Sequence, residues 1–396
     1  MNSVHNPYTP GAGTRPSELA GRDEIITKVD VALQRIMAGR SEKSVLMVGL
    51  RGVGKTVLLN QLRDNARKHG MTTVMIEAPE KRSLPAMLMP PMRSALLELS
   101  RKEMGKELTQ KAMRAMGSFV KAMKVKFNDL EFSVDLGLED GIADTGDFEH
   151  DLSALLLTIG EAARAAKSAF IIFIDELQYV KETDLAALIT ALHACAQQTL
   201  PVSLVGAGLP QLVGNMGRAK SYAERLFDYP EVGKLTRKAA LDALVKPAAA
   251  AHIAFTDDAL NLILQRTQCY PYFLQEWGKH SWNIAAQSPI TAQDVQQADD
   301  HAIAELDASF FRVRFERCTP TEKMYLRAMA DLGGDLSRSG DIAAHMNKQT
   351  NQVAPVRNSL IKKGMIYSPA HGDTAYTVPL FADYMKRVIP APSSPI

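Results

Sequence analysis

The chain has 396 residues, which is too long for one ordinary domain of roughly 150 residues and suits two or three domains. Hydrophobic residues make up 46% and charged residues 23% of the sequence, as in an average globular protein, so disorder of the whole chain is excluded. The formal net charge of +2 is close to neutral, so overall charge gives no argument for nucleic-acid binding, and only local basic patches could support it.

The cysteines and the hydropathy pattern predict a cytoplasmic protein. Cys195, Cys269 and Cys318 lie far apart and form no CxxC motif, so neither a zinc site nor a disulfide framework is indicated. The longest uncharged apolar run, 169–174, is far shorter than the roughly 20 residues that span a bilayer. The first ten residues lack the pattern of a signal peptide, so we expect neither export nor membrane insertion.

Residues 1–20 are rich in proline and glycine and predict an extended arm that packs on another part of the surface. Short apolar or β-branched runs then alternate with longer helical patterns, which is typical of a parallel α/β sheet. These runs are 44–48, 73–76, 170–174 and 202–205. We therefore expect a parallel sheet flanked by helices over residues 21–235.

The segment of about 85–150 is an insertion with an unusual charge pattern. Eight basic residues fall between Arg101 and Lys126, whereas residues 129–151 contain nine acids and no lysine or arginine. Alternating apolar residues from Leu130 to Leu138 predict a strand, paired with Val125 and Phe127 in a hairpin. A helix and hairpin with solvated charged faces and a docking surface for a partner both remain open.

The first expected strand runs directly into a phosphate-binding motif of the form GxxxxGK[ST], followed by a helical pattern. Its glycines let successive backbone N–H groups turn towards a phosphate, and the start of the helix favours an anion. We expect Lys55 to reach the β- and γ-phosphates and the Thr56 hydroxyl to ligate Mg²⁺. The motif and the next helical residue are Gly49-Leu50-Arg51-Gly52-Val53-Gly54-Lys55-Thr56-Val57.

The apolar run 170–174 ends in Asp175 and Glu176, which is the second half expected of such a site. We expect Asp175 to hold Mg²⁺ through water and Glu176 to polarise the attacking water as a general base. Thr27-Lys28-Val29-Asp30 has the letters of a guanine-reading element but precedes the loop, so the order favours ATP over GTP. ATP and Mg²⁺ are therefore the predicted ligands.

After residue 236 the pattern is helical, and we expect a helical lid with a connecting helix over 236–305 and a C-terminal module over 306–390. In that module, Thr319-Pro320-Thr321-Glu322 is typical of a capping box that opens a helix. Helices 322–330, 340–346 and 352–363, followed by strands 365–367 and 375–378, predict a winged helix. We expect Thr350 or Asn351 to cap its third helix.

The C-terminal module has a local excess of positive charge, with seven basic against three acidic residues between Ser337 and Arg387. Such an excess supports contacts with the phosphates of double-stranded DNA. Docking on a protein partner remains the alternative, because many winged helices bind only protein. The predicted DNA contacts are Arg338, Lys348, Asn351, Arg357, Lys362 and Lys363.

The loop, the Asp-Glu strand, the helical lid and the C-terminal module, in this order, resemble the AAA+ ATPases. Within them the chain looks most like the initiator clade of origin recognition complex-type proteins and related archaeal and bacterial ATPases. The resemblance covers about residues 6–388. It rests mainly on residues 49–56, residues 171–176, the entry motif Leu19-Ala20-Gly21-Arg22-Asp23-Glu24, and Tyr270-Pro271-Tyr272-Phe273-Leu274-Gln275.

The resemblance implies that residues 6–22, including Arg22, line the adenine pocket. It also implies an arginine that acts on the nucleotide of a neighbouring subunit, with Arg225 the first candidate and Arg218 the second. Such a guanidinium would neutralise charge on the γ-phosphate during hydrolysis. Self-association or binding to a partner protein is therefore expected.

Two departures from the family pattern predict slow turnover. Gly206 stands in the strand that usually supplies a polar side chain to the γ-phosphate, and the lid lacks a GxxR-type arginine. Two functions follow. One is an ATP-hydrolysing switch that engages DNA through the C-terminal module. The other is a signalling or defence scaffold with slow turnover, whose winged helix binds protein.

Overall fold

The computed structural model describes residues 1–11, 13–78, 83–123, 139, 141–333, 336–370 and 372–390. The chain divides into two compact units. The first unit comprises Met1–Gly21, Leu50–Gly54 and Gly233–Ile396, and the second comprises Arg22–Gly49 and Lys55–Val232.

The second unit is built on a five-stranded parallel sheet with the strand order β2-β3-β4-β1-β5. The strands are β1 (Ser44–Val48), β2 (Thr72–Glu77), β3 (Phe170–Asp175), β4 (Val202–Gly208) and β5 (Phe227–Asp228). All residues of β3 and β4 are buried, which explains why these strands are mostly apolar, with Asp175 and Ser203 as the polar exceptions. The predicted parallel α/β fold is confirmed, and β5 is an additional strand that the sequence did not reveal.

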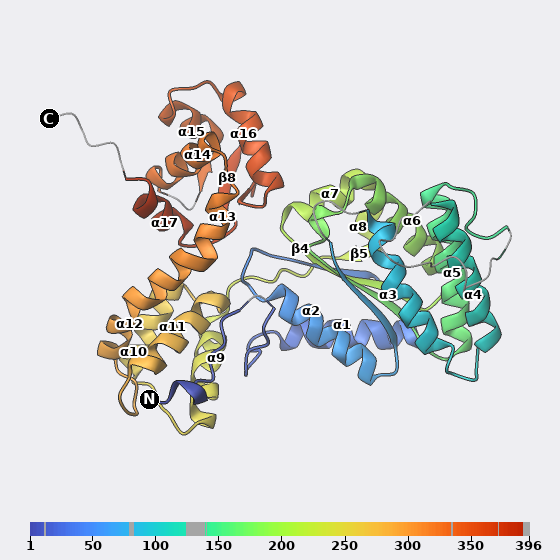
Figure 1. Cartoon of the computed structure of the whole chain (residues 1–396), viewed down its shortest axis with the longest axis horizontal. Helices are drawn as coiled ribbons and strands as arrows, with labels where there is room; N and C mark the ends of the chain where they lie inside the picture. Colours follow the sequence, from blue (N-terminus) through green and yellow to red (C-terminus); the bar gives the residue numbers. More distant parts are fainter. Residues whose placement is uncertain are drawn as a thin grey trace. The chain divides into compact units, whose positions relative to one another are not determined.

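Helices cover both faces of this sheet (Figure 1). On one face lie α1 (Asp23–Met37) and α2 (Lys55–Lys68). On the other face lie α5 (Phe148–Ala165) and α6 (Glu182–Gln197), with α4 (Lys106–Ala122) packed beside α5 and α3 (Leu84–Leu99) packed against α4 and β2. Short helices α7 (Gln211–Ala219) and α8 (Ala223–Leu226) precede β5.

The described part of the charged insertion belongs to the main hydrophobic core. Met92 of α3 and Phe119 of α4 are fully buried in one cluster with Leu155 of α5. The basic residues on α3 and α4 are therefore carried by helices whose buried faces belong to the core. The expected hairpin, residues 125–138, lies outside the described residues.

In the first unit, the N-terminal arm packs on helices α9 (Arg237–Ala250) and α11 (Pro271–Ile284). The Tyr8 hydroxyl donates a hydrogen bond to the Leu244 carbonyl, and its ring lies edge-on to Phe255 and Trp282. A Cβ atom at Gly278 would come within 2.8 Å of the Tyr8 ring, so this position leaves room only for glycine. The arm contains the short helix η1 (Ser3–His5).

The helical lid also contains α10 (Asp257–Thr267) and α12 (Ala292–Glu305). A π-helical segment, η3 (Leu306–Phe311), leads from α12 into α13 (Arg312–Glu316). Pro271 occupies the first position of α11, where a missing backbone N–H costs no helical hydrogen bond.

The C-terminal module has three helices, a small antiparallel sheet and a final helix. In chain order these are α14 (Pro320–Asp331), β6 (Ser337–Arg338), α15 (Ser339–His345), α16 (Thr350–Lys362), β7 (Ile366–Tyr367), β8 (Asp373–Tyr376) and α17 (Phe381–Val388). The sheet order is β6-β8-β7, and both strand pairs are antiparallel. The predicted capping box of Thr319 and Glu322 is present at the start of α14.

The predicted cap of α16 is wrong. Neither Thr350 nor Asn351 caps this helix, because both already belong to its first turn. Gln349 is the cap and forms a reciprocal capping box with Gln352, whose side chain accepts a hydrogen bond from the Gln349 backbone N–H at 2.9 Å. An amide side chain thus replaces the shorter hydroxyl or asparagine that capping preferences favour.

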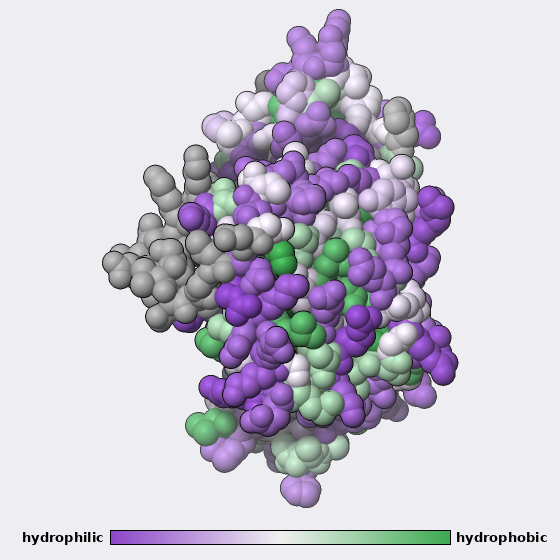
Figure 2. Space-filling model, turned by 90° about the vertical axis from the view of Figure 1, so that its right-hand side faces the viewer, coloured by the Kyte–Doolittle hydropathy of each residue, from purple (hydrophilic) through white to green (hydrophobic). Residues whose placement is uncertain are grey.

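Among the residues that the structure describes, none of the helices combines the length and apolar character needed to cross a bilayer. On the face in Figure 2, small groups of hydrophobic residues are separated by hydrophilic ones. Single exposed hydrophobic side chains of this kind are ordinary on protein surfaces.

Candidate nucleotide-binding site

The loop between β1 and α2 has the backbone conformation that a phosphate-binding loop needs. Gly52 and Gly54 adopt φ angles of +80° and +90°, in the left-handed region that side chains disfavour. The tight turn delivers the chain into α2, whose first residue is Lys55. Unpaired backbone N–H groups at the start of a helix attract anions. The loop at the carboxyl end of β1 therefore has the conformation expected of an anion-binding loop.

Lys55 is buried, with only 6% of its surface exposed. Its ammonium group donates a hydrogen bond to the Gly49 carbonyl at 3.0 Å. Gly49 is held in turn by its N–H group, which donates to the Gly208 carbonyl at the end of β4 at 3.1 Å. The positive charge is therefore fixed at the edge of the sheet where β1 and β4 end.

Thr56 and Asp175 meet at the same edge. The Thr56 hydroxyl donates a hydrogen bond of 2.5 Å to Asp175 Oδ2, and the Glu176 N–H donates to Asp175 Oδ1 at 2.8 Å. Burial raises the pKa of the Asp175 carboxyl, whereas these two hydrogen bonds oppose the rise. A hydroxyl and a carboxylate are the oxygen donors that Mg²⁺ prefers, so this pair fits the predicted metal ion.

Glu176 follows the end of β3 with a φ angle of +52°. Its carboxylate accepts a hydrogen bond from the side-chain amide of Gln178, a residue of the short helix η2 (Leu177–Tyr179). Sequence reasoning missed Gln178. A single glutamine between Leu177 and Tyr179 forms no recognisable motif, so only its contacts in the structure assign it to the site.

Gly206 occupies a position in β4 where no side chain fits. A Cβ atom there would come within 2.6 Å of Leu46 and 3.2 Å of Leu177. The absence of a polar side chain at this point of β4 is therefore a requirement of the packing between β4, β1 and the turn after β3.

The three candidate arginines lie in different places. Arg22 is buried at the start of α1, and burial lowers the pKa of its guanidinium group. Arg218 forms an ion pair with Glu182 at the surface. Arg225 precedes Phe227, which pairs with Ser44, the first residue of β1. Arg225 therefore lies near the amino-terminal ends of the strands, whereas Lys55 lies beyond their carboxyl-terminal ends.

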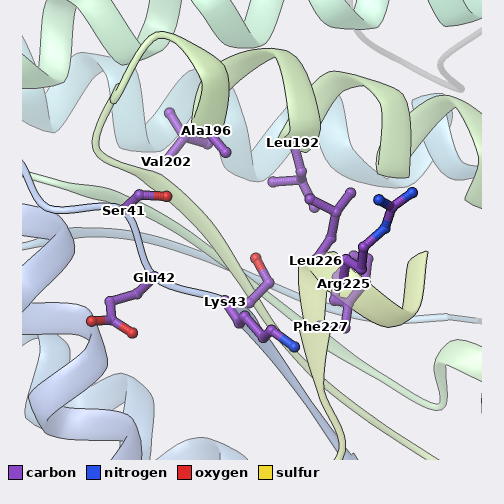
Figure 3. A pocket seen from close by; sticks show the side chains of 10 residues that line it. Ser41, Glu42, Lys43, Leu192, Ala196, Val202, Arg225, Leu226 and Phe227 are labelled. Carbon is purple, nitrogen blue, oxygen red and sulfur yellow. The ribbon is translucent and has the colours of Figure 1, made fainter. Parts of the chain in front are cut away.

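A pocket of about 220 Å³ lies at this amino edge. Figure 3 shows the Arg225 side chain extending beside Leu226. The pocket is lined by Ser41, Glu42, Lys43, Ser44, Leu192, Ala196, Val202, Arg225, Leu226 and Phe227. Arg225 and Lys55 thus lie beyond opposite ends of the five-residue strand β1, which is about 16 Å long at about 3.3 Å per residue.

Within the first unit, residues 50–54 contact the conspicuous aromatic segment of the lid. The Tyr270 hydroxyl donates a hydrogen bond to the Arg51 carbonyl, and the Tyr272 N–H donates to the Gly52 carbonyl at 3.3 Å. The Arg51 N–H donates to the carbonyl of Thr377, in the C-terminal module, also at 3.3 Å. The outer side of the phosphate loop is thus bonded to two later segments of the chain.

The predicted DNA contacts fall into two groups. Four side chains are exposed on the C-terminal module: Arg338, Lys348, Asn351 and Lys362. Arg357 instead donates hydrogen bonds to Thr374 and Ser368 of the β7-β8 region, at 3.1 and 2.7 Å.

Lys363 forms an ion pair of 2.7 Å with the nearly buried Glu322. Lys363 and Arg357 therefore hold the module together, a structural use that charge counting from the sequence did not anticipate.

Comparisons with known proteins agree with this architecture. Residues 18–205 match the AAA ATPase domain family, and residues 308–385 match a domain of unknown function, DUF8462. No curated protein sequence matches the chain.

Among solved structures, a Walker-type ATPase of Pyrococcus abyssi superposes with a TM-score of 0.59 at 15% identity, covering 94% of this chain and 97% of that chain. The Orc1 protein of Aeropyrum pernix in complex with DNA gives 0.46 at 15% identity, covering 94% of each chain. The RuvB Holliday junction branch migration motor of Thermotoga maritima gives 0.45 at 16%, covering 95% and 99%. The fold is that of a P-loop ATPase of the AAA+ type.

Proposed function

We propose that this protein binds ATP with Mg²⁺ and hydrolyses it to ADP and phosphate. The observation that carries the proposal is the hydrogen bond between Thr56 and Asp175, which brings a hydroxyl and a carboxylate together beside the buried Lys55. The match of residues 18–205 to the AAA ATPase domain supports the same conclusion. This part of the chain carries the positive charge, the backbone turn and the oxygen donors that a Mg²⁺-nucleotide requires.

Each residue has a distinct role in the proposed site. Backbone N–H groups of residues 52–56, including those of Val53 and Gly54, would surround the β-phosphate, with Val57 in the first turn of the same helix. Lys55 would bind the β- and γ-phosphates, and Arg22 would contribute to the adenine pocket. Thr56 and Asp175 would hold Mg²⁺, Asp175 through water. When bound, Mg²⁺ would neutralise negative charge on the phosphate oxygens.

Glu176 is the proposed general base. Its carboxylate would accept a proton from the attacking water while the water oxygen forms a bond to the γ-phosphorus. The bond between the γ-phosphorus and the bridging oxygen breaks, and ADP leaves with that electron pair. Lys55 stabilises the charge on the departing group.

Removal of Mg²⁺ tests the hydrolysis directly. We expect excess EDTA to lower phosphate release from ATP at least about 100-fold, because a metal ion contributes several kcal/mol to stabilising the transition state. Added Mg²⁺ should restore the rate. A rate that EDTA leaves unchanged would contradict the assignment of Thr56 and Asp175 as metal ligands.

We further propose that the protein works with copies of itself or with a partner protein. Arg225 lies at the amino edge of the sheet and so could act only on a nucleotide bound by another subunit. Its guanidinium would neutralise charge on the γ-phosphate of that subunit during hydrolysis. Arg218 is the weaker candidate, because Glu182 and Asn215 already bind it.

The proposed partner of the C-terminal module is double-stranded DNA. Exposed Lys348, Asn351 and Gln352 gather around the start of α16, and Arg338 and Lys362 are exposed on the same module. As a winged helix, the module would insert α16 into the major groove, with its first turn near the base edges. Arg357 and Lys363 would support the fold of this surface through their bonds within the module.

Replacing Arg338, Lys348 and Lys362 together with alanine tests the DNA proposal. Each lost phosphate contact should reduce the slope of log affinity against log salt by about 0.9, so we expect the slope to fall by about 2.7. Fluorescence anisotropy with a labelled duplex measures this. The matched control replaces the exposed Arg40, Lys68 and Lys238 with alanine and should bind normally. Equal affinity and slope for both triple variants would remove the DNA proposal.

A protein-binding scaffold with slow turnover is the second candidate. The observation that favours it is that two of the predicted DNA contacts, Arg357 and Lys363, already bond to other residues within the C-terminal module. If the C-terminal module binds protein and not DNA, the unmodified chain and both triple variants should all fail to bind the labelled duplex.

A further inference from the structure

Gln178 connects the candidate general base to the neighbouring strand. Gln178 is buried, with only 9% of the residue's surface exposed. Its Nε2 group donates a hydrogen bond to Glu176 Oε2, and its Oε1 atom accepts a hydrogen bond from the Leu209 backbone N–H at 3.0 Å. Leu209 immediately follows β4. One buried amide thus joins the Glu176 carboxylate to the carboxyl end of β4.

The glycines of β4 leave space for this amide. A Cβ atom on Gly208 would come within 2.8 Å of Gln178 Oε1, closer than non-bonded contacts allow. Gly206 likewise admits no side chain, because of Leu46 and Leu177. The end of β4 therefore offers no side chain of its own at Gly206 or Gly208, and the polar group above it comes from the turn after β3.

We propose that Gln178 is a positioning residue that orients the carboxylate of Glu176 from the end of β4. This inference rests on the proposed ATP hydrolysis, because it assigns Gln178 an effect on that reaction. Gln178 acts through the carboxylate of Glu176 rather than by touching the nucleotide itself.

The physical basis is the fixed direction of the amide. Glu176 has a φ angle of +52°, a backbone conformation that is sparsely populated for residues with a side chain and that needs support from its surroundings. The Gln178 donor holds one oxygen of the carboxylate, and the bond to Leu209 prevents the amide from rotating. A general base held in one orientation keeps the attacking water aligned for reaction. Because the same amide is anchored on β4, a shift at the end of β4 would move the base.

Gln178→Glu separates positioning from a merely structural role. The introduced carboxylate has the same shape and can still accept the Leu209 N–H, but when ionised it offers no donor and repels Glu176. We expect kcat for ATP hydrolysis to fall about 10-fold or more with KM changed less than about twofold, the signature of a lost transition-state interaction. Gln178→Ala should show the same split, and Gln197→Ala on the exposed end of α6 is the matched control.

A double-mutant cycle shows whether the effect passes through Glu176. In single-turnover measurements, Gln178→Ala should slow the Glu176→Gln variant by less than about twofold, because the base is already lost. Two results would overturn the inference while hydrolysis by the unmodified chain stands. One is a kcat for Gln178→Glu equal to that of the unmodified chain. The other is that Gln178→Ala lowers the hydrolysis rate by the same factor in the unmodified chain and in the Glu176→Gln variant. If the unmodified chain releases no phosphate, the proposed hydrolysis fails, and this inference fails with it.

Discussion

Replacing Lys55 with alanine is expected to weaken ATP binding about 100-fold, which corresponds to about 3 kcal/mol at this site. Lys55 is buried and held by the Gly49 carbonyl at the end of β1, so its charge is already placed for a phosphate before binding. A preorganised ammonium loses little freedom when it binds an anion, and its removal leaves the phosphates without their main positive partner. Equilibrium binding of a fluorescent ATP analogue measures the change.

Lys68→Ala is the matched control for this experiment. Lys68 is exposed in the last turn of α2, the helix that Lys55 begins, so both substitutions remove one lysine from the same helix. The control should bind ATP with unchanged affinity. Equal affinity in Lys55→Ala and in the unmodified chain would show that the loop is not the phosphate site.

Glu176→Gln is expected to lower steady-state phosphate release by between about 100-fold and 10,000-fold, the range that general bases contribute. ATP affinity should remain within about twofold, because the substitution keeps the shape of the side chain and leaves Lys55, Thr56 and Asp175 in place. Phosphate release and equilibrium binding, measured on the same preparation, separate the two effects.

Glu182→Gln provides the control, since Glu182 lies at the start of α6 and pairs with Arg218 at the surface. Its phosphate release should match that of the unmodified chain. If Glu176→Gln retains full turnover, the base is another group, and if it loses ATP binding as well, Glu176 has a structural role.

The sheet and the phosphate loop could be predicted because their signals are local. Residues 170–174 are apolar because β3 is buried along its length, and the glycine spacing before Lys55 reflects the backbone turn itself. In contrast, β5 has only two residues, Phe227 and Asp228, too few to form a recognisable pattern. Its place in the sheet is set by pairing with β1.

The features that could not be predicted depend on contacts between residues that are far apart in the sequence or form no local pattern. Gln178 became visible as part of the site only when its bonds to Glu176 and Leu209 were known. Counting charges predicted Arg357 and Lys363 as DNA contacts, but their bonds to Ser368 and Glu322 depend on how α16 packs in the module. Charge along a sequence does not distinguish a surface cation from one that stabilises a fold.

Titration calorimetry of the full chain with Mg·ATP tests most directly whether residues 49–56 bind a nucleotide. We expect a saturable heat of binding with about one nucleotide per chain, and a much weaker signal for Lys55→Ala under the same conditions. A folded, unmodified chain that gives no heat with either Mg·ATP or Mg·ADP at several temperatures would contradict it.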